Sequence, residues 1–266
     1  MLELSDSVRA VMARVSEITG KGFNLVEKKD LVPHAAIKIA RRGMPSHLIH
    51  YRSVRGGILN HLIAHECAHA IRMCSVPEER RLVPASNRET MTAALKPMLA
   101  DIERISRTIQ SDKAPEYFNM LYHGLVRQLT NYPSDIAIEK WLYDEYPALR
   151  DDQMQSLLGQ RDEAAQALTP RVRDFTPGKT YQAAHVMNHT FFKLLSEHTA
   201  KPLLGRFERA GFEDQGNALA ALTAQGPSAT YEDDIAMVNR WAEFLELKDW
   251  FTWVGFEQVQ DGYATS

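Results

Sequence analysis

The chain has 266 residues, of which 44% are hydrophobic and 24% are charged, close to the averages of a globular protein. This composition excludes an intrinsically disordered chain, which has fewer apolar residues. The formal net charge is −3. Such a near-neutral balance gives no basic surface of the kind that binds nucleic acid or an anionic membrane, so we expect neither as a partner.

The cysteine content and the first segment bear on location. Cys67 and Cys74 are the two cysteines, too few for a disulfide framework, and we expect them to be small buried side chains in a reducing compartment. Arg9 and Arg14 interrupt the first segment, whereas a secretory signal needs ~7–15 continuous apolar residues. A membrane-spanning helix needs ~18 apolar residues in succession, and the sequence has no such run. We therefore expect a cytoplasmic protein.

The elements in chain order begin with an amphipathic helix, because apolar residues recur at helical spacing between Leu4 and Ile18. Glycine and proline then separate three short β-like stretches, and Gly56-Gly57 precedes a strong helix. The expected elements are a helix over 4–18, strands over 23–26, 36–39 and 47–51, and a helix over 58–73.

Almost everything after residue 86 is predicted to be helical. Pro97 is expected to bend the first of these helices, Pro133 to separate two others, and Ser134 to cap the helix that it precedes. The expected helices cover 87–110, 114–131, 134–146, 151–168, 180–198 and, in an aromatic-rich stretch, 231–256.

The most informative stretch is His65-Glu66-Cys67-Ala68-His69. Positions four apart lie on one face of a helix, so His65 and His69 can both bind one metal ion at ~2.0–2.1 Å. Glu66 projects beside such an ion and could take a proton from a metal-bound water, whose pKa zinc lowers toward ~7. The plainer interpretation is a helix that carries two histidines by chance.

His61 extends the same stripe of histidines by one turn. Three histidines over this distance span ~12 Å along the axis, too far for one ion. Because Glu66 directly follows His65, we expect His65 and His69 to be the ligands and His61 to be a polar neighbour. Ser75 stands where a metzincin would place a third histidine ligand, which excludes that type.

A catalytic zinc takes three protein ligands, so a further one is needed. Asp135 and Glu139 lie one turn apart among apolar residues, and acids in such surroundings need a partner or a metal. We favour Asp135 as the ligand and Glu139 as the hydrogen-bond partner of a ligand histidine, with the reverse assignment left open. The alternative is that both acids lie at the polar edge of an ordinary helix.

A second histidine pair, His185 and His189, lacks the intervening glutamate and is expected to serve packing or polar contacts. The functional alternative is that one of the two steadies an oxyanion in the cleft. Tyr132, His123 and Tyr181 are further candidates for that role.

The motif at His65, Glu66 and His69 resembles the active-site helix of the zincin metallopeptidases. The order of helix, short strands and motif helix over 1–75 is similar to compact intracellular zincins of the ImmA/IrrE type, and the Asp135 helix is more like that of some phage and bacterial metallopeptidases. The resemblance implies two histidine ligands, a glutamate base, and a small sheet whose edge strand, over 47–51, holds an extended peptide by strand addition.

We therefore expect an α+β, mostly helical protein with a zincin-like core. That core has a small mixed sheet and an active-site helix. The expected division is a catalytic region over 1–148 and a helical region over 149–266, or one continuous domain. The hypothesis is a zinc-dependent intracellular metallopeptidase with one Zn²⁺ per chain, a specific protein or peptide target and Glu66 as general base. The alternatives are a catalytically inactive zincin-fold binding or regulatory module and, less favoured, hydrolysis of a non-peptide amide.

Overall fold

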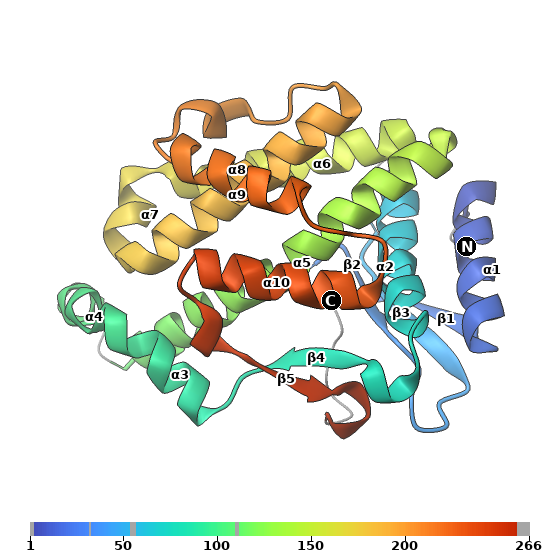
Figure 1. The fold of residues 1–266 in the computed structure, drawn as a ribbon, viewed down its shortest axis with the longest axis horizontal. Coiled ribbons are helices and arrows are strands. Elements are labelled where there is room, and N and C mark those ends of the chain that lie inside the picture. The colour runs from blue at the N-terminus through green and yellow to red at the C-terminus, as the bar shows by residue number, and fades with distance from the viewer. Residues whose placement is uncertain (1–2, 32, 54–56, 110–111, 260–266) are drawn as a thin grey trace.

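The structure is a computed structural model, and it describes residues 3–31, 33–53, 57–109 and 112–259. The described chain is mostly helical, with a three-stranded mixed sheet and a two-stranded antiparallel pair, which confirms the α+β class (Figure 1). The helices are α1 (Asp6–Thr19), α2 (Ile58–Cys74), α3 (Arg88–Leu95), α4 (Leu99–Ser106), α5 (Ala114–Glu145), α6 (Arg150–Ala165), α7 (Pro170–Phe175), α8 (Gly178–Thr199), α9 (Glu213–Ala224) and α10 (Tyr231–Phe244). The strands are β1 (Gly22–Glu27), β2 (Ala35–Lys38), β3 (Ser46–Tyr51), β4 (Leu82–Ala85) and β5 (Thr252–Gly255).

The first helix and the sheet follow the sequence pattern closely. Val8, Val11 and Val15 are fully buried on one face of α1, which packs against α2. Gly20 ends α1 in the left-handed conformation, with φ 67°, and its N–H donates to the Ser16 carbonyl, as a glycine C-cap does. The three predicted strands and the motif helix all form.

The order of the sheet is β1-β3-β2, with β1 parallel and β2 antiparallel to β3. The prediction of 47–51 as the edge strand is wrong, because β3 lies in the middle and both neighbours hydrogen-bond to it. The edge strand beside α2 is β2. Arg52 N–H donates to the His34 carbonyl, so by antiparallel alternation the backbone groups of Ile37 face away from β3, toward the outer edge of the sheet.

Helix α5 runs for 32 residues without a break at Pro133, so the prediction of two helices separated there is wrong. A proline inside a helix costs about 3 kcal/mol, but Leu129 and Ile136 on either side of it are buried in a large core. This burial outweighs the local preference. Ser134 is therefore not an N-cap, and its hydroxyl donates to the Asn131 carbonyl at 2.8 Å.

Two other helical predictions need correction. The helix expected over 87–110 is divided into α3 and α4 by a 3-10 turn that contains Pro97, and residue 110 lies outside the described residues. The stretch over 231–256 is helical only to Phe244, and its last part forms β5, which pairs with β4 from much earlier in the chain. Trp241, Trp250, Phe251 and Phe256 are buried as expected, whereas Tyr231, Phe244 and Trp253 are half-buried.

The interior has two main hydrophobic cores, and α5 contributes to both. Ile138 and Leu142 pack with α1, α2 and the sheet, whereas Leu129 and Ile136 pack with α8 and α10. Figure 1 shows α5 passing between the sheet side of the molecule and the layer formed by α6, α8 and α9. Phe256, near the end of the described chain, lies in the first core, while the division at residue 148 stays a prediction.

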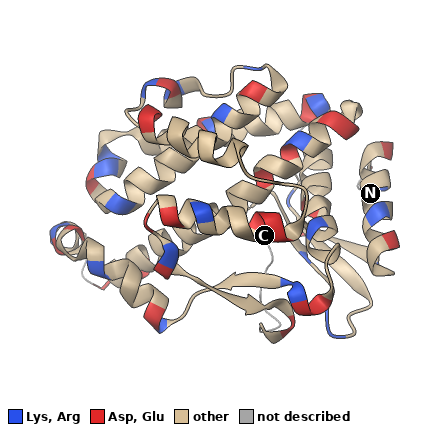
Figure 2. Ribbon diagram, viewed as in Figure 1, with Lys and Arg blue, Asp and Glu red and all other residues tan. Residues whose placement is uncertain are grey.

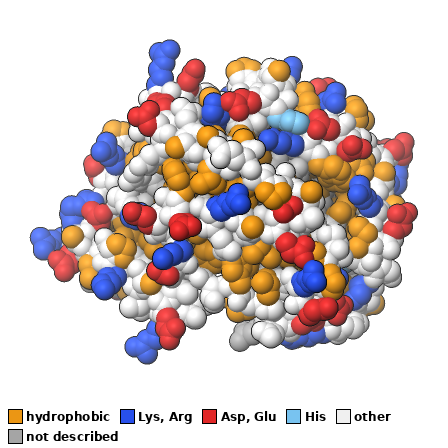
Figure 3. Space-filling view, in the orientation of Figure 1, with side chains coloured by type: hydrophobic (Ala, Val, Ile, Leu, Met, Phe, Trp, Pro, Cys, Tyr) orange, Lys and Arg blue, Asp and Glu red, His pale blue; other side chains and the backbone are white. Residues whose placement is uncertain are grey.

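Acidic and basic residues are interspersed along the helices (Figure 2). On the face seen in Figure 3, charged side chains of both signs are spread over the surface with hydrophobic side chains between them. None of the described helices combines the length and the apolar character that crossing a membrane requires. Cys67 and Cys74 are free and buried, and burial raises the pKa of both thiols, so both are the small buried side chains expected.

Candidate metal centre

Helices α2 and α5 bring His65, His69 and Asp135 together. The two histidine Nε2 atoms lie 3.1 Å apart, and Asp135 Oδ1 lies 3.1 Å from His69 Nε2 and 3.5 Å from His65 Nε2. A tetrahedral zinc with bonds of about 2.0–2.1 Å has its ligand atoms about 3.3 Å from one another. The three atoms are therefore spaced like three corners of a zinc tetrahedron.

The Asp135 carboxylate has an oxygen whose hydrogen-bonding capacity is not met by the described residues, and a cation would meet it. Its Oδ1 is buried and accepts no hydrogen bond from the described residues. Burial acts to raise the pKa of Asp135, but interactions with His65 and His69 outweigh it and lower that pKa, which keeps the group ionised. A buried anionic oxygen without a donor is costly, and a metal ion would satisfy it.

Glu139 lies one turn further along α5 and is used differently. Its Oε1 lies 2.8 Å from His65 Nδ1, and its Oε2 lies 3.0 Å from His61 Nε2 and 2.6 Å from Gln153 Nε2. Burial acts to raise the pKa of Glu139, but the neighbouring His61 and His65 outweigh it and lower that pKa. Both oxygens already face donors, so Glu139 is placed to orient His65 with its Nε2 directed at Asp135 and His69.

Two sets of side chains could hold a metal by proximity: His65, His69 and Asp135, or His61, His65 and Glu139. The hydrogen bonds distinguish them, because Glu139 is occupied by three donors and Asp135 Oδ1 by none of the described residues. His65 can present Nε2 to the first set while Nδ1–H donates to Glu139, the usual arrangement of a metal-bound histidine. His61 is thus the polar neighbour predicted from the sequence, and its Nε2 contacts Glu139.

Glu66 lies between α2 and the edge of the sheet. Its Oε2 accepts a hydrogen bond from the Ile37 N–H at 3.0 Å, the backbone group that points away from β3. The side chain is buried, with 8% exposed, yet it lines the same cleft as His65 and His69. The strand therefore fixes the carboxylate that follows the first histidine of the motif.

His65, His69 and Asp135, the candidate metal ligands, line a cleft with a volume of about 800 Å³, hereafter the large lobe, between α2, α5, α6 and α8. A second hollow of about 470 Å³, hereafter the small lobe, lies between α2, α5, α10 and β4. His69 lines both. The apolar wall of the large lobe includes Leu121, Leu125, Val172, Ala184 and Phe191.

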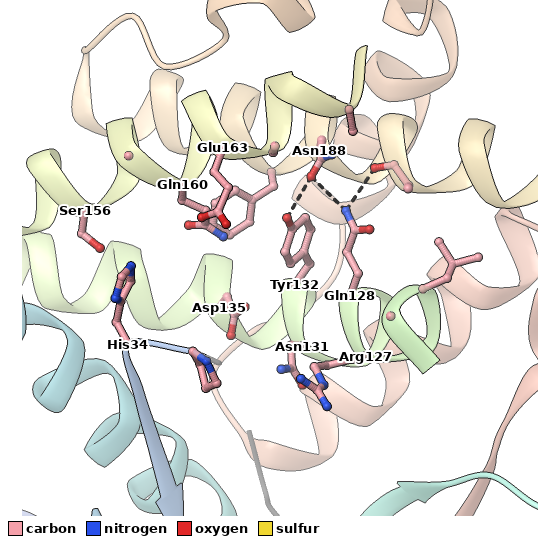
Figure 4. Close-up of a pocket in the computed structure, with 18 of the residues that line it drawn as sticks. His34, Arg127, Gln128, Asn131, Tyr132, Asp135, Ser156, Gln160, Glu163 and Asn188 are labelled. Atoms are coloured by element: carbon pink, nitrogen blue, oxygen red, sulfur yellow. Dashed lines mark hydrogen bonds between the residues drawn. The ribbon is translucent and has the colours of Figure 1, made fainter. Parts of the chain in front are cut away.

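A hydrogen-bonded group forms part of the wall of the large lobe (Figure 4). The Tyr132 hydroxyl donates to Asn188 Oδ1 at 2.8 Å, and Gln128 Nε2 donates to the same oxygen at 2.9 Å and to the Ala184 carbonyl at 3.0 Å. Burial, followed by the charge of Asp135, raises the pKa of Tyr132. The Tyr132 hydroxyl proton is already donated to Asn188, so the geometry does not favour Tyr132 as the donor to an oxyanion.

The other candidates for that role differ in position. His189 is buried, its Nδ1 lies 3.1 Å from the Phe207 carbonyl, and it serves packing and polar contacts, as predicted. His185 and Tyr181 line the large lobe, where their rings lie 4.3 Å apart, and burial lowers the pKa of His185 to about 4. His123 lines the small lobe.

Two contributors to the site were missed by the sequence analysis. Gln153 of α6 donates both to the Glu139 side chain and, at 2.7 Å, to its backbone carbonyl. Arg72, one turn after His69, forms a bidentate ion pair with Asp234 of α10, with both contacts at 2.6 Å. Each of these contacts joins elements that are not neighbours in the local sequence pattern, so the pattern around either residue does not predict it.

Comparison with known proteins gives no relative for this chain: no protein-family model matches it, and neither a curated protein nor a solved structure does. The features that bear on the class of protein are the motif helix α2, the long helix α5 and the cleft that both helices line.

Proposed function

We propose that this chain is a zinc-dependent intracellular metallopeptidase with a zincin-like core. The observation that carries the proposal is the convergence of His65 Nε2, His69 Nε2 and Asp135 Oδ1 at 3.1–3.5 Å from one another, beside Glu66. A closed structural zinc site has four protein ligands, whereas three ligands on an open cleft are typical of a catalytic site. The cytoplasmic location expected from the sequence is part of the proposal.

The donor set fits one zinc ion per chain, held by His65, His69 and Asp135. Two imidazoles and a carboxylate suit zinc and also other transition metals, so the identity of the ion is itself proposed. When bound, zinc polarises a carbonyl and lowers the pKa of a water molecule to ~7. Glu139 would keep His65 in the tautomer that binds metal through Nε2.

Glu66 is the proposed general base. It takes the proton of the attacking water and passes it to the leaving amine, as a carboxylate in reach of both can do. The Ile37 N–H holds this carboxylate in place. Ala35, two residues earlier on the same outer edge of β2, lines the cleft and could pair with an extended peptide, so β2 takes the role expected of 47–51.

Metal content of purified protein, measured by mass spectrometry, is the first test. We expect about one zinc per wild-type chain, and loss of it in His69→Ala and in Asp135→Ala. Glu139→Ala is the matched control one turn away, and we expect it to retain zinc with weakened affinity. No zinc in wild-type protein after reconstitution would overturn the proposal, and zinc lost only in Glu139→Ala would reverse the two carboxylate roles.

Glu66→Gln separates the peptidase from a binding module. In the zinc-loaded variant we expect full zinc content and loss of peptide cleavage, because an amide cannot accept the proton. The measurement is cleavage of a synthetic peptide library, read by mass spectrometry. Cleavage that persists in Glu66→Gln would contradict the assigned base.

A further inference from the structure

The large and small lobes meet at one side of the metal centre. The residues that line both are His69 of α2 and Arg127 and Asn131 of α5. A peptide that passed from one lobe to the other across the metal centre would therefore pass between His69 and this face of α5.

Arg127, Asn131 and Asp135 share one face of α5, because they are spaced four residues apart. Arg127 is two turns before Asp135, which is about 12 Å along the helix axis. An extended peptide advances about 3.3 Å per residue, so this distance corresponds to at most about four residues from the reacting bond. Figure 4 shows the Arg127 and Asn131 side chains next to each other in the view.

Arg127 is exposed, and its guanidinium group forms no ion pair or hydrogen bond within the described part of the chain. The other arginine among the described residues of the two lobes is Arg72, which is paired with Asp234 at 2.6 Å. The Asn131 side-chain amide likewise has no hydrogen bond to the described residues. The junction thus presents a free cation and a free amide donor to whatever lies in the cleft.

We propose that Arg127 and Asn131 bind a carboxylate of the substrate, within about four residues of the cleaved bond. This rests on the proposed peptidase function and adds the chemical class of its substrate. The planar guanidinium donates two parallel hydrogen bonds to a carboxylate, and the Asn131 amide supplies another donor one turn away. In a peptide that carboxylate belongs either to an aspartate or glutamate side chain or to the free C-terminus.

The test uses synthetic octapeptides of random sequence, each made with a free and with an amidated C-terminus. Zinc-loaded wild type, Arg127→Gln and Arg107→Gln are compared, since Arg107 is exposed at the end of α4 and lines neither lobe. Cleavage is read by mass spectrometry. Binding of the same peptides is measured separately in the uncleaving Glu66→Gln background, with and without Arg127→Gln.

We expect wild type and Arg107→Gln to prefer peptides with a carboxylate near the cleaved bond, and Arg127→Gln to lose about tenfold or more of that preference. Peptides without such a carboxylate should be cleaved equally by all three proteins. A preference for peptides with acidic residues, unchanged by amidation, identifies a side-chain carboxylate. A preference for peptides with a free C-terminus, abolished by amidation, identifies the C-terminal carboxylate. Either result supports the inference.

The two proposals fail in different ways. If wild type cleaves peptides with a preference that Arg127→Gln leaves unchanged, the carboxylate site is wrong and the peptidase stands. If acidic peptides bind in an Arg127-dependent manner but zinc-loaded wild type cleaves none, the peptidase is wrong and the carboxylate site stands. If carboxylates affect neither cleavage nor binding, the inference falls regardless of activity.

Discussion

At the scale of single residues, the role of Glu139 depends on which side chains donate hydrogen bonds to its carboxylate. His61 and His65 come from the motif helix, but Gln153 comes from α6 and is fully buried. Its amide contacts both the side chain and the backbone carbonyl of Glu139, and so fixes the carboxylate that orients His65. Gln153 is therefore a positioning residue for the proposed metal centre.

Replacing Gln153 by leucine should weaken zinc binding by about 10–100-fold, because partners that orient a ligand histidine contribute that much to metal affinity. The zinc dissociation constant can be measured by competition with a chromophoric chelator. Gln155→Leu is the control, since Gln155 lies on the same helix and lines the cleft without contacting Glu139. Equal zinc affinity in Gln153→Leu and wild type would show that Glu139 needs no support from α6.

The sequence could predict the motif residues because helical spacing alone puts His65 and His69 on one face. It favoured Asp135 over Glu139 as the third ligand but left the reverse assignment open, since both acids lie on the same face of the helix, one turn apart. What distinguishes them is the set of donors around Glu139, and Gln153 in particular comes from another element. Arg127 gave no signal for the same reason: its significance depends on the two lobes that meet beside it.

At the scale of elements, β3 carries a histidine that is fully buried in the sheet. His47 Nδ1 accepts a hydrogen bond from the Ala40 N–H at 3.1 Å, and its Nε2 lies 3.0 Å from Thr19 Oγ1 at the end of α1. Burial, and then the charge of Lys21, lowers the pKa of His47 from 6.5 to about 4. The folded state thus keeps this ring neutral where an unfolded chain would protonate it.

This predicts loss of stability in acid. Between pH 6.5 and 4 the unfolded chain binds the proton that folded His47 does not, so the free energy of unfolding falls as the pH falls through this window. The contribution of His47 is at most about 3 kcal/mol. Urea unfolding of metal-free protein at several pH values should show a flatter pH dependence in His47→Gln, and the exposed control His34→Gln should follow wild type. An unchanged slope in His47→Gln would contradict the prediction.

The strand and helix predictions succeeded where local pattern and tertiary packing agree. Glycine and proline separate the strands β1, β2 and β3 and precede the motif helix α2, and all four elements form as expected. The break at Pro133 failed because burial along α5 exceeds the local cost of a proline. The aromatic stretch after Phe244 failed because β5 needs β4 as its partner, and the two are far apart in the sequence.

At the scale of the whole molecule, a buried ion pair joins the C-terminal helix α10 to the motif helix. Arg72 donates twice to Asp234 at 2.6 Å and also to the Ser228 carbonyl at 2.9 Å. The Asp234 side chain is 7% exposed, so removing one partner leaves a charge in a desolvated place. The pair is placed to hold α10 one turn from His69.

Breaking this pair in Arg72→Met should lower the free energy of unfolding by about 3–5 kcal/mol, since it leaves the Asp234 charge buried without a partner. The double variant with Asp234→Leu should be less destabilised than the sum of the single changes. The exposed pair of Arg80 and Glu232, at 3.3 Å, is the matched control, and its removal should cost about 0–1 kcal/mol. Additive effects at Arg72 and Asp234 would show that the pair contributes no coupling.

Helix α5 packs in both cores, so if either core unfolds, the other loses the contacts that α5 provides. We therefore expect a single cooperative transition on heating, rather than two, despite the length of the chain. A nick in the short connection between α5 and α6 should leave two pieces that stay together, because α5 remains packed against α8 and α10 from the other piece. Such a nicked protein would elute as one particle and separate only in denaturant.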